Sequence, residues 1–272
     1  MAAPDLALRV ASACLFVPLV LASSWFGGLA LFALVIIIVG RGSWEFYQLA
    51  AAAGHRPAAK SGILLCLGWT LCLQFDTSGH WLLPLAVCAT AIAFLASLRP
   101  DASGYLTNAA ITVGGFVYVG ILGSTPLLIV RHAVERQWPE PTFILLILFA
   151  SIWITDTAAY LCGHYFGNRK LVPGISPGKT VVGFVAGAVA ALMPLALHEF
   201  VPLSLAELGG LLLLVGIVGQ VGDIVESAIK RDAGVKDAPA LIPGHGGMLD
   251  RFDSYLFAFP LCYVYLTIVG AN

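Results

Sequence analysis

The sequence predicts an all-α membrane protein, a polytopic bundle of about nine transmembrane helices. Hydrophobic residues make up 59% of the 272-residue chain and charged residues only 11%, and long apolar runs recur along it. A soluble domain carries roughly 25% charged residues. This chain could not cover a globule with polar surface, so a soluble enzyme is excluded. The 14 basic and 15 acidic residues leave a net charge of −1, which disfavours a nucleic-acid partner.

The apolar runs define the expected spans, because a transmembrane helix needs about 20 largely apolar residues. The first two runs are separated only by Ser23-Ser24 and Gly27-Gly28, so one long helix and a tight pair of helices both stay possible. The expected spans are Leu6–Ser23, Trp25–Val39, Ser61–Phe75, Trp81–Leu98, Asn108–Val130, Thr142–Cys162, Thr180–Val201, Ser204–Glu226 and Phe252–Val269.

The distribution of Lys and Arg orients these spans. With nine spans and a cytoplasmic N-terminus, twelve of the fourteen basic residues fall on the cytoplasmic side, and only Arg131 and Arg136 fall on the other. Basic residues are retained on the cytoplasmic side of membrane proteins. The sequence therefore predicts an N-terminus inside the cell and a C-terminus outside.

The polar residues divide the chain into two regions. Residues 1–141 are expected to form a helical scaffold with possible dimer contacts, and the only notable polar group there, around Trp44 and Glu45, is typical of interfacial anchors. Residues 142–272 hold four polar clusters and are expected to form the catalytic region.

The first cluster surrounds Asp156 in the sixth expected span. Asp156, Tyr160 and Gly163 are spaced i, i+4 and i+7, so they share one helical face. A carboxylate within a membrane span is costly and is usually functional. A structural aspartate paired with a neighbouring polar group is the alternative.

The second cluster lies in the expected loop 167–180, which ends in Ser176-Pro-Gly-Lys179-Thr180 at the start of the seventh span. Backbone N–H groups at a helix start favour phosphate, and Lys179 adds a full charge. The segment is not a Walker A motif, because Pro173 stands where that motif needs glycine. An ordinary helix cap beside a cytoplasmic lysine is the alternative.

The third cluster ends the eighth span. Asp223, Ser227, Lys230 and Arg231 are spaced i, i+4, i+7 and i+8, which is one stripe on a helix. A carboxylate followed by a hydroxyl and two cations suits a metal ion beside phosphate groups. A solvated helix tail is the alternative.

The fourth cluster precedes the ninth span and contains Lys236-Asp237 and the glycine-rich segment around His245. Glycines Gly246 and Gly247 permit close approach of the backbone to a ligand. Asp250 follows at the start of the span, where it could hold Mg²⁺ together with Asp223 and substrate phosphates. Simple capping of the helix by Asp250 or Asp253 is the alternative.

The expected topology places all four clusters at the cytoplasmic leaflet. Carboxylates mixed with cations are what metal-assisted phosphoryl transfer requires. A site at the leaflet boundary can take a lipid from one side and a soluble phosphate compound from the other. We therefore expect Asp223 and Asp250 to share one ion, with about 4–7 Å between their carboxylates.

The motifs closely resemble those of the phosphatidate cytidylyltransferases, also called CDP-diacylglycerol synthases, and the convincing similarity covers residues 151–253. The residues that carry it are Ser227-x-x-Lys230-Arg231-x4-Lys236-Asp237-x5-Pro243-x-His245-Gly246-Gly247-x-x-Asp250-Arg251-x-Asp253, Ser176-Pro177-x-Lys179-Thr180 and Asp156-x-x-Ala159-Tyr160-x-x-Gly163-x-x-Phe166-Gly167. The chain departs from the family pattern at Gly178, often a lysine, and at Val182, usually acidic.

The resemblance implies the reaction of CTP with phosphatidate to give CDP-diacylglycerol and pyrophosphate. It also implies Mg²⁺, with K⁺ as a further cofactor, in a dimeric enzyme of the bacterial inner membrane. The family's metal-binding aspartates correspond to Asp223 and Asp250. The catalytic residues expected are Asp223, Asp250, Lys179, Lys230, Arg231 and His245, with Asp156, Tyr160, Ser176, Thr180, Ser227, Lys236, Asp237, Gly246, Gly247 and Arg251 binding substrate.

Three other functions compete with this interpretation. In an ion-coupled transporter, Asp156 and Asp223 would be ion sites, but transporters place such groups near the midplane of the membrane. A CDP-alcohol transferase would carry a DGxxAR run, which this sequence lacks. An inactive homologue that acts as a scaffold is the third.

Overall fold

The computed structural model describes residues 16–76, 79–100, 102–238 and 246–269. The chain forms two compact units, and each is described by itself. Unit 1 comprises Met1–Ser23, Gly28–Leu127 and Ile229–Arg251, and unit 2 comprises Ser24–Gly27, Leu128–Ala228 and Phe252–Asn272. The described residues are largely helical, as expected, but they also include one short two-stranded ribbon that the sequence analysis treated as a loop.

Unit 1 is built around helices from the N-terminal half of the chain. They are α2 (Gly28–Ala52), α3 (Ala59–Phe75), α4 (Leu82–Ala96), α5 (Tyr105–Gly115) and the π-helical segment η1 (Phe116–Ile121). The α3 helix packs against α2, α4 and η1.

One buried tyrosine organises the centre of unit 1. Tyr47 of α2 donates from its hydroxyl to the Thr112 carbonyl at 2.8 Å. Its ring occupies the space that a side chain at Gly62 or Gly115 would need. These two glycines therefore let α3 and α5 close over Tyr47, which satisfies its polar tip within an apolar core.

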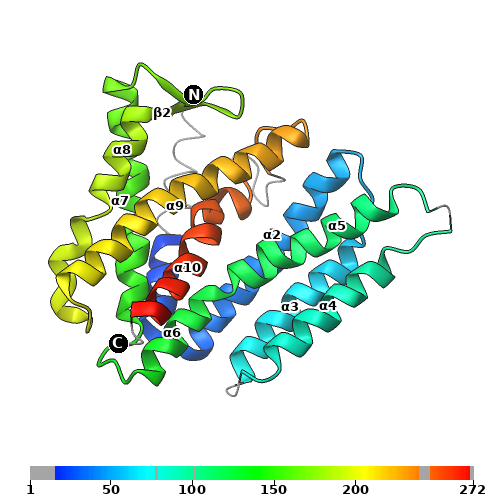
Figure 1. The fold of residues 1–272 in the computed structure, drawn as a ribbon, viewed down its shortest axis with the longest axis horizontal. Coiled ribbons are helices and arrows are strands. Elements are labelled where there is room, and N and C mark those ends of the chain that lie inside the picture. Colours follow the sequence, from blue (N-terminus) through cyan, green and yellow to red (C-terminus); the bar gives the residue numbers. More distant parts are fainter. Residues whose placement is uncertain (1–15, 77–78, 101, 239–245, 270–272) are drawn as a thin grey trace. The chain divides into compact units, whose positions relative to one another are not determined.

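Unit 2 contains most of the C-terminal half. Its elements are α7 (Phe143–Phe166), β1 (Lys170–Val172), β2 (Ser176–Thr180), α8 (Val181–Ala190), the 3₁₀ segment η2 (Met193–Phe200) and most of α9 (Leu205–Asp232) and α10 (Leu249–Val269), with α6 (Thr125–Glu135) mostly in this unit. Strands β1 and β2 pair antiparallel, with Lys170 opposite Thr180. Figure 1 shows α7 and α8 side by side, with β2 at one end of the pair.

Close approach of α7 and α8 depends on glycine. A Cβ atom at Gly183 would lie 2.5 Å from the Ala159 carbonyl oxygen, and one at Gly187 would lie 3.0 Å from the Thr155 carbonyl oxygen. Small residues four apart allow helices in membranes to pack backbone against backbone. The α7–α8 pair consequently forms one wall that carries Asp156 at a defined position.

Five described helices are long and apolar enough to cross a membrane, or six if the bent pair 105–121 and 125–135 is one span. Two shorter apolar helices, Ala59–Phe75 and Leu82–Ala96, overlap expected spans, and a third, Phe16–Phe26, runs across the boundary expected at Ser23-Ser24. Gly27 and Gly28 both have positive φ values, of 60° and 49°, and a break at Gly27 separates the first two helices. The chain is therefore a helical membrane protein, whereas nine crossings stay a prediction.

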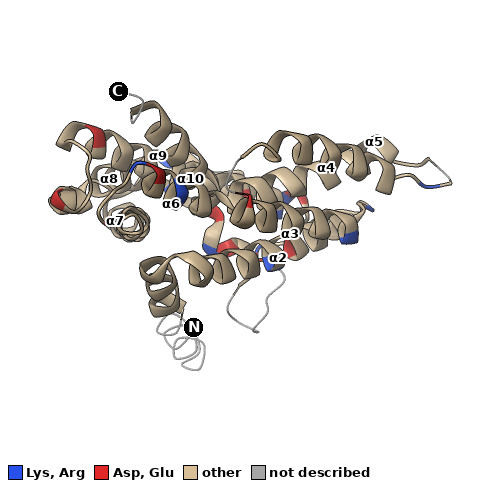
Figure 2. Cartoon of the chain, turned by 90° about the horizontal axis from the view of Figure 1, so that it is seen from below, with Lys and Arg blue, Asp and Glu red and all other residues tan. Residues whose placement is uncertain are grey.

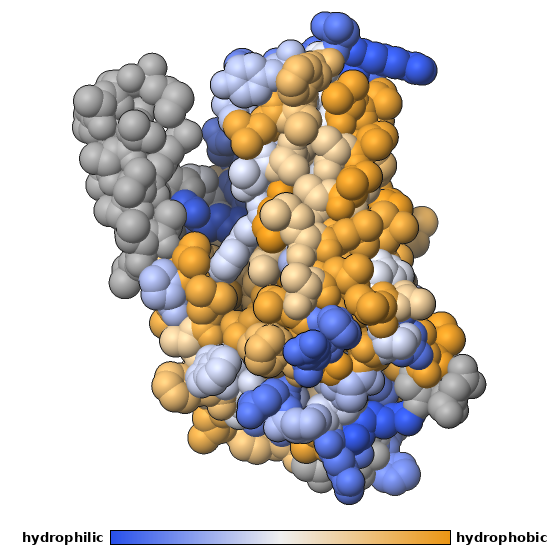
Figure 3. All heavy atoms as spheres, turned by 90° about the vertical axis from the view of Figure 1, so that its left-hand side faces the viewer, coloured by the Kyte–Doolittle hydropathy of each residue, from blue (hydrophilic) through white to orange (hydrophobic). Residues whose placement is uncertain are grey.

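The surfaces fit a lipid environment. Figure 2 shows few charged residues along the helices, and α4 has none over its length. The face drawn in Figure 3 is hydrophobic over its middle, and hydrophilic residues gather at its ends. On α8, Val185 and Val189 are more than half exposed, as expected of side chains that contact acyl chains.

Candidate active site

Unit 2 holds a cavity of about 570 Å³, lined by charged and polar side chains together with apolar ones. It opens between the end of α7, the β1–β2 ribbon and α9. Six of the expected site residues line it, namely Asp156, Tyr160, Ser176, Lys179, Thr180 and Asp223. This volume is in the range of small-molecule sites, roughly 300–1,000 Å³. Residues from three of the four sequence clusters therefore line one cavity.

Thr180 fixes the corner where the ribbon becomes α8. Its hydroxyl oxygen accepts a hydrogen bond from the Gly183 amide at 3.1 Å, which caps the helix. Side chains at Gly163 and Gly167 would collide with that hydroxyl. The end of α7 can thus approach the cap only because both positions are glycine. The capping alternative is correct for Thr180, which is buried although it borders the cavity.

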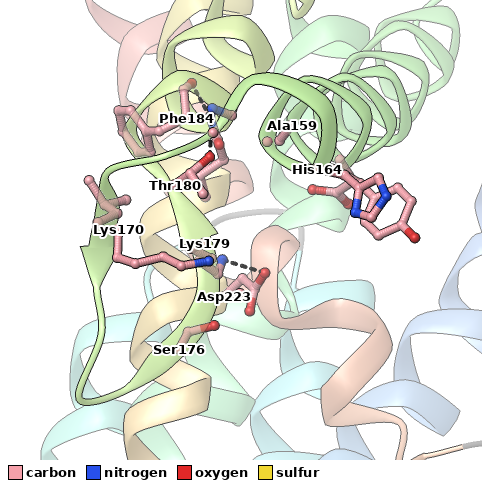
Figure 4. A pocket seen from close by; sticks show the side chains of 16 residues that line it. Ala159, His164, Lys170, Ser176, Lys179, Thr180, Phe184 and Asp223 are labelled. Atoms are coloured by element: carbon pink, nitrogen blue, oxygen red, sulfur yellow. Dashed lines mark hydrogen bonds and ion pairs between the residues drawn. The ribbon is translucent and has the colours of Figure 1, made fainter.

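Lys179 and Asp223 form an ion pair in this cavity. The Lys179 Nζ atom donates to Asp223 Oδ2 at 2.5 Å, and Figure 4 shows the lysine reaching from the ribbon toward the carboxylate. Ser227, one turn further along α9, donates to Asp223 Oδ1 at 3.4 Å. The side chains of Lys179 and Asp223 are 22% and 36% exposed, so the pair is accessible from the cavity.

Further carboxylates surround Asp223. Asp156 interacts electrostatically with both Asp223 and Lys179. Asp253 on α10 interacts with Asp223, Asp156 and the buried Glu226. Asp223 therefore lies among further acidic groups, and both Lys179 and Lys170 line the same cavity.

The donor set fits Mg²⁺ only in part. Among the described residues, no group of three or more His, Cys, Asp or Glu side chains could hold a metal ion. Mg²⁺ commonly takes one or two protein carboxylates and completes its shell with water and substrate phosphates. The hard oxygens of Asp223 are suited to that mode of binding, whereas an all-protein metal cage is not formed by these residues.

Unit 1 contains a second lysine–aspartate pair. Lys230, near the end of α9, donates from Nζ to Asp250 Oδ1 at 2.5 Å. The other carboxylate oxygen of Asp250 accepts from the amides of Gly247 and Ala238, at 2.7 and 3.0 Å. Gly246 has a φ of 69°, so it adopts the left-handed conformation that favours glycine. Asp250 therefore binds both Lys230 and the backbone before α10.

The remaining expected residues have other positions. Arg231 donates from Nη1 to the Val235 carbonyl at 3.3 Å, which ties it to the end of α9. Lys236 and Asp237 are exposed, and Arg251 is half-buried in the first turn of α10. His245 lies outside the described residues. A shared ion at Asp223 and Asp250 stays a prediction.

Several cavity residues were missed by the sequence analysis. Lys170 and His164 line the cavity, and the latter stacks on Tyr160 with ring centroids 6.1 Å apart. Gln220 lines it too and donates from Nε2 to the Phe184 carbonyl at 3.0 Å. The sequence did hold a signal for Gln220, namely a polar amide within an apolar run, three residues before Asp223.

The described helices define a helical membrane protein, and its unit 2 holds a cavity lined by the Lys179–Asp223 pair. The family model described as the cytidylyltransferase family matches residues 7–269. The chain belongs to this family.

Named relatives agree with that assignment. A phosphatidate cytidylyltransferase of Staphylococcus saprophyticus is 38% identical over 215 residues, which cover 75% of this chain and 78% of that protein. A phosphatidate cytidylyltransferase of Synechocystis is 33% identical over 288 residues and 96% of each chain. One of Staphylococcus epidermidis is 49% identical over 127 residues, 45% of this chain and 48% of that protein. The resemblance seen in the motifs is confirmed.

Proposed function

We propose that this protein transfers the cytidylyl group of CTP to phosphatidate, giving CDP-diacylglycerol and pyrophosphate. The observation that carries the proposal is the cavity with its Lys179–Asp223 pair, in a membrane chain of the cytidylyltransferase family. Relatives that match this chain over most of their length bear the name of this activity.

The reaction is a direct displacement. An anionic phosphate oxygen of phosphatidate attacks the α-phosphorus of CTP, and a new O–P bond forms. The bond from the α-phosphorus to the bridging oxygen breaks, and pyrophosphate leaves with the electron pair. The attacking oxygen is already ionised near neutral pH, so no side chain needs to remove its proton. The protein contributes positioning and charge stabilisation.

Lysines act as phosphate clamps in this scheme. Lys179 and Lys230 each form an ion pair with an aspartate, which holds the ammonium group in place when no substrate is bound. An arriving phosphate offers a second anionic partner, and the charge-assisted hydrogen bonds formed are about twice as strong as neutral ones. Arg231 and His245 are proposed to donate to further phosphate oxygens.

Asp223 and Asp250 would hold Mg²⁺ in the substrate complex. When bound, the ion supplies positive charge that stabilises the leaving pyrophosphate. Asp223 and Asp250 would supply carboxylate oxygens to the ion, and Lys179 and Lys230 would bind phosphate oxygens. K⁺ is proposed as a further cofactor.

The proposal extends to the setting of the enzyme. Phosphatidate enters from the membrane and CTP from the cytoplasm, in a homodimer of the bacterial inner membrane with nine spans. The excess of basic residues on one side of the expected topology supports this orientation.

The test is incorporation of radiolabelled CTP into lipid by purified protein in phosphatidate-containing micelles. Label at the α-phosphate should appear in lipid, whereas label at the γ-phosphate should appear in pyrophosphate. Lys179→Met should abolish the appearance of both labels. Lys60→Met, at an exposed position of α3, is the matched control. Wild-type protein that transfers neither label would refute the proposed function.

A further inference from the structure

Glu45 on α2 is a fully buried carboxylate, with an exposed fraction of 0%. An interfacial anchor keeps its polar end in water, so the anchoring role expected from the sequence is wrong for Glu45. Burying an ionised carboxylate is costly unless it is paired and hydrogen-bonded. The position of Glu45 therefore requires specific partners.

Those partners come from two places far apart in the sequence. Arg41, one turn earlier on α2, donates from Nε to Glu45 Oε1 at 2.9 Å. The backbone amide of Leu249 donates to Glu45 Oε2 at 2.8 Å. Leu249 is the first residue of α10, where unpaired N–H groups and the helix dipole favour a negative charge.

Gly247 shows how closely the carboxylate approaches this backbone. A Cβ atom at Gly247 would lie 2.5 Å from Glu45 Oε2 and 2.7 Å from Ala238 Cβ. A side chain at that position would displace Glu45. Glycine is thus required by the contact itself, since no positive φ is recorded for Gly247.

The same short segment is bound by Asp250. Its Oδ2 atom accepts from the amides of Gly247 and Ala238, while its Oδ1 atom accepts from Lys230. Glu45 holds the start of α10 from one side, and Asp250 holds the segment before it. The two carboxylates together set the backbone around Gly247 and the direction of the Asp250 side chain.

We infer that Glu45 is a positioning residue for cytidylyl transfer, which it supports by fixing the start of α10 and thereby the Asp250–Lys230 pair. This inference rests on the proposed function. It assigns part of the catalytic arrangement to the N-terminal helices, through Glu45 and its partner Arg41.

The experiment compares Glu45→Ala and Glu45→Gln with the wild type, and Glu140→Gln, at an exposed residue of unit 2, is the control. Hydrogen exchange of the peptide covering residues 246–251 reports the anchoring without any need for turnover. Steady-state kinetics at varied CTP concentration report how this anchoring affects the KM for CTP.

Glu45→Ala removes the acceptor of the Leu249 amide, so exchange of that peptide should accelerate about 10-fold or more, the scale of one lost charge-assisted hydrogen bond. The KM for CTP should rise by a similar factor. Glu45→Gln keeps an acceptor oxygen, so it should restore much of the protection. The control should match the wild type in both measurements.

A merely structural role gives a different result. If Glu45→Gln and Glu45→Ala reduce turnover only in proportion to the folded fraction, with KM and exchange of residues 246–251 unchanged, the inference is wrong. Wild-type protein without transferase activity would instead refute the proposed function, and the exchange data would still decide whether Glu45 anchors α10.

Discussion

Replacement of Asp223 by Asn tests the centre of the proposed site. The change preserves the size of the side chain and removes the charge that faces Lys179 at 2.5 Å. Stabilisation by a bound metal ion is worth several kcal/mol of the barrier. We expect cytidylyl transfer to fall at least ~100-fold, which corresponds to about 2.7 kcal/mol.

The same change should hardly affect folding. The side chains of Lys179 and Asp223 are 22% and 36% exposed, and ion pairs in such settings contribute only about 0–1 kcal/mol to stability. Asn can still accept a hydrogen bond from Ser227, which donates to Asp223 at 3.4 Å. A large loss of activity with a small change in unfolding temperature is therefore the expected signature.

The assay measures label transfer to lipid at saturating Mg²⁺, beside thermal unfolding in detergent. Asp232→Asn, at the exposed end of the same helix, is the matched control and should retain activity. Turnover of Asp223→Asn close to that of the wild type would refute the assignment of Asp223, and loss of folding would refute the view that the pair is mainly catalytic.

Three further changes test the architecture. Gly183→Ala would place a methyl group 2.5 Å from the Ala159 carbonyl oxygen, and the forced separation of α7 and α8 should cost about 1–3 kcal/mol in thermal unfolding. Thr180→Val removes the cap of α8 and should cost about 1 kcal/mol, whereas Thr180→Ser should retain it in the same measurement. A third test replaces the six native cysteines and introduces single cysteines beside Asp156 and Asp223. These cysteines should react with an impermeant thiol reagent only from the cytoplasmic side. Reaction from both faces would indicate a transporter.

Helical spacing explains why part of the cavity could be predicted from the sequence. Asp156, Tyr160 and Gly163 were expected on one helical face, and all three line the cavity. Their relation depends only on the 3.6-residue period within one helix. The cap at Thr180, at the start of α8, could also be predicted, because a helix cap depends on residues that are adjacent in the sequence.

The ribbon was harder to predict. Strands β1 and β2 are three and five residues long, and their sequence lacks the alternation of apolar and polar residues that signals a half-buried strand. The pairing places Lys170 opposite Thr180, which brings a second lysine to the cavity. Lys170 was counted only as a basic residue of a cytoplasmic loop.

Glu45 could not be assigned from local sequence at all. Its acceptor role depends on Leu249, 204 residues away, and no periodicity relates such distant positions. The sequence showed a charged residue near the end of an apolar run, which fits an anchor as well as a buried ion pair. The burial of the Glu45 side chain decides between these alternatives, and that burial depends on how the helices of the unit pack.

The two lysine–aspartate pairs follow one physical rule. In each unit, an aspartate holds a lysine at 2.5 Å. A lysine without a nearby anion would lie free in water and lose more side-chain entropy when it binds phosphate. A lysine already ordered by an aspartate loses less, and preorganised charges stabilise a transition state without further rearrangement. In the proposed reaction, the aspartates would thus support phosphate binding by holding the two lysines in place.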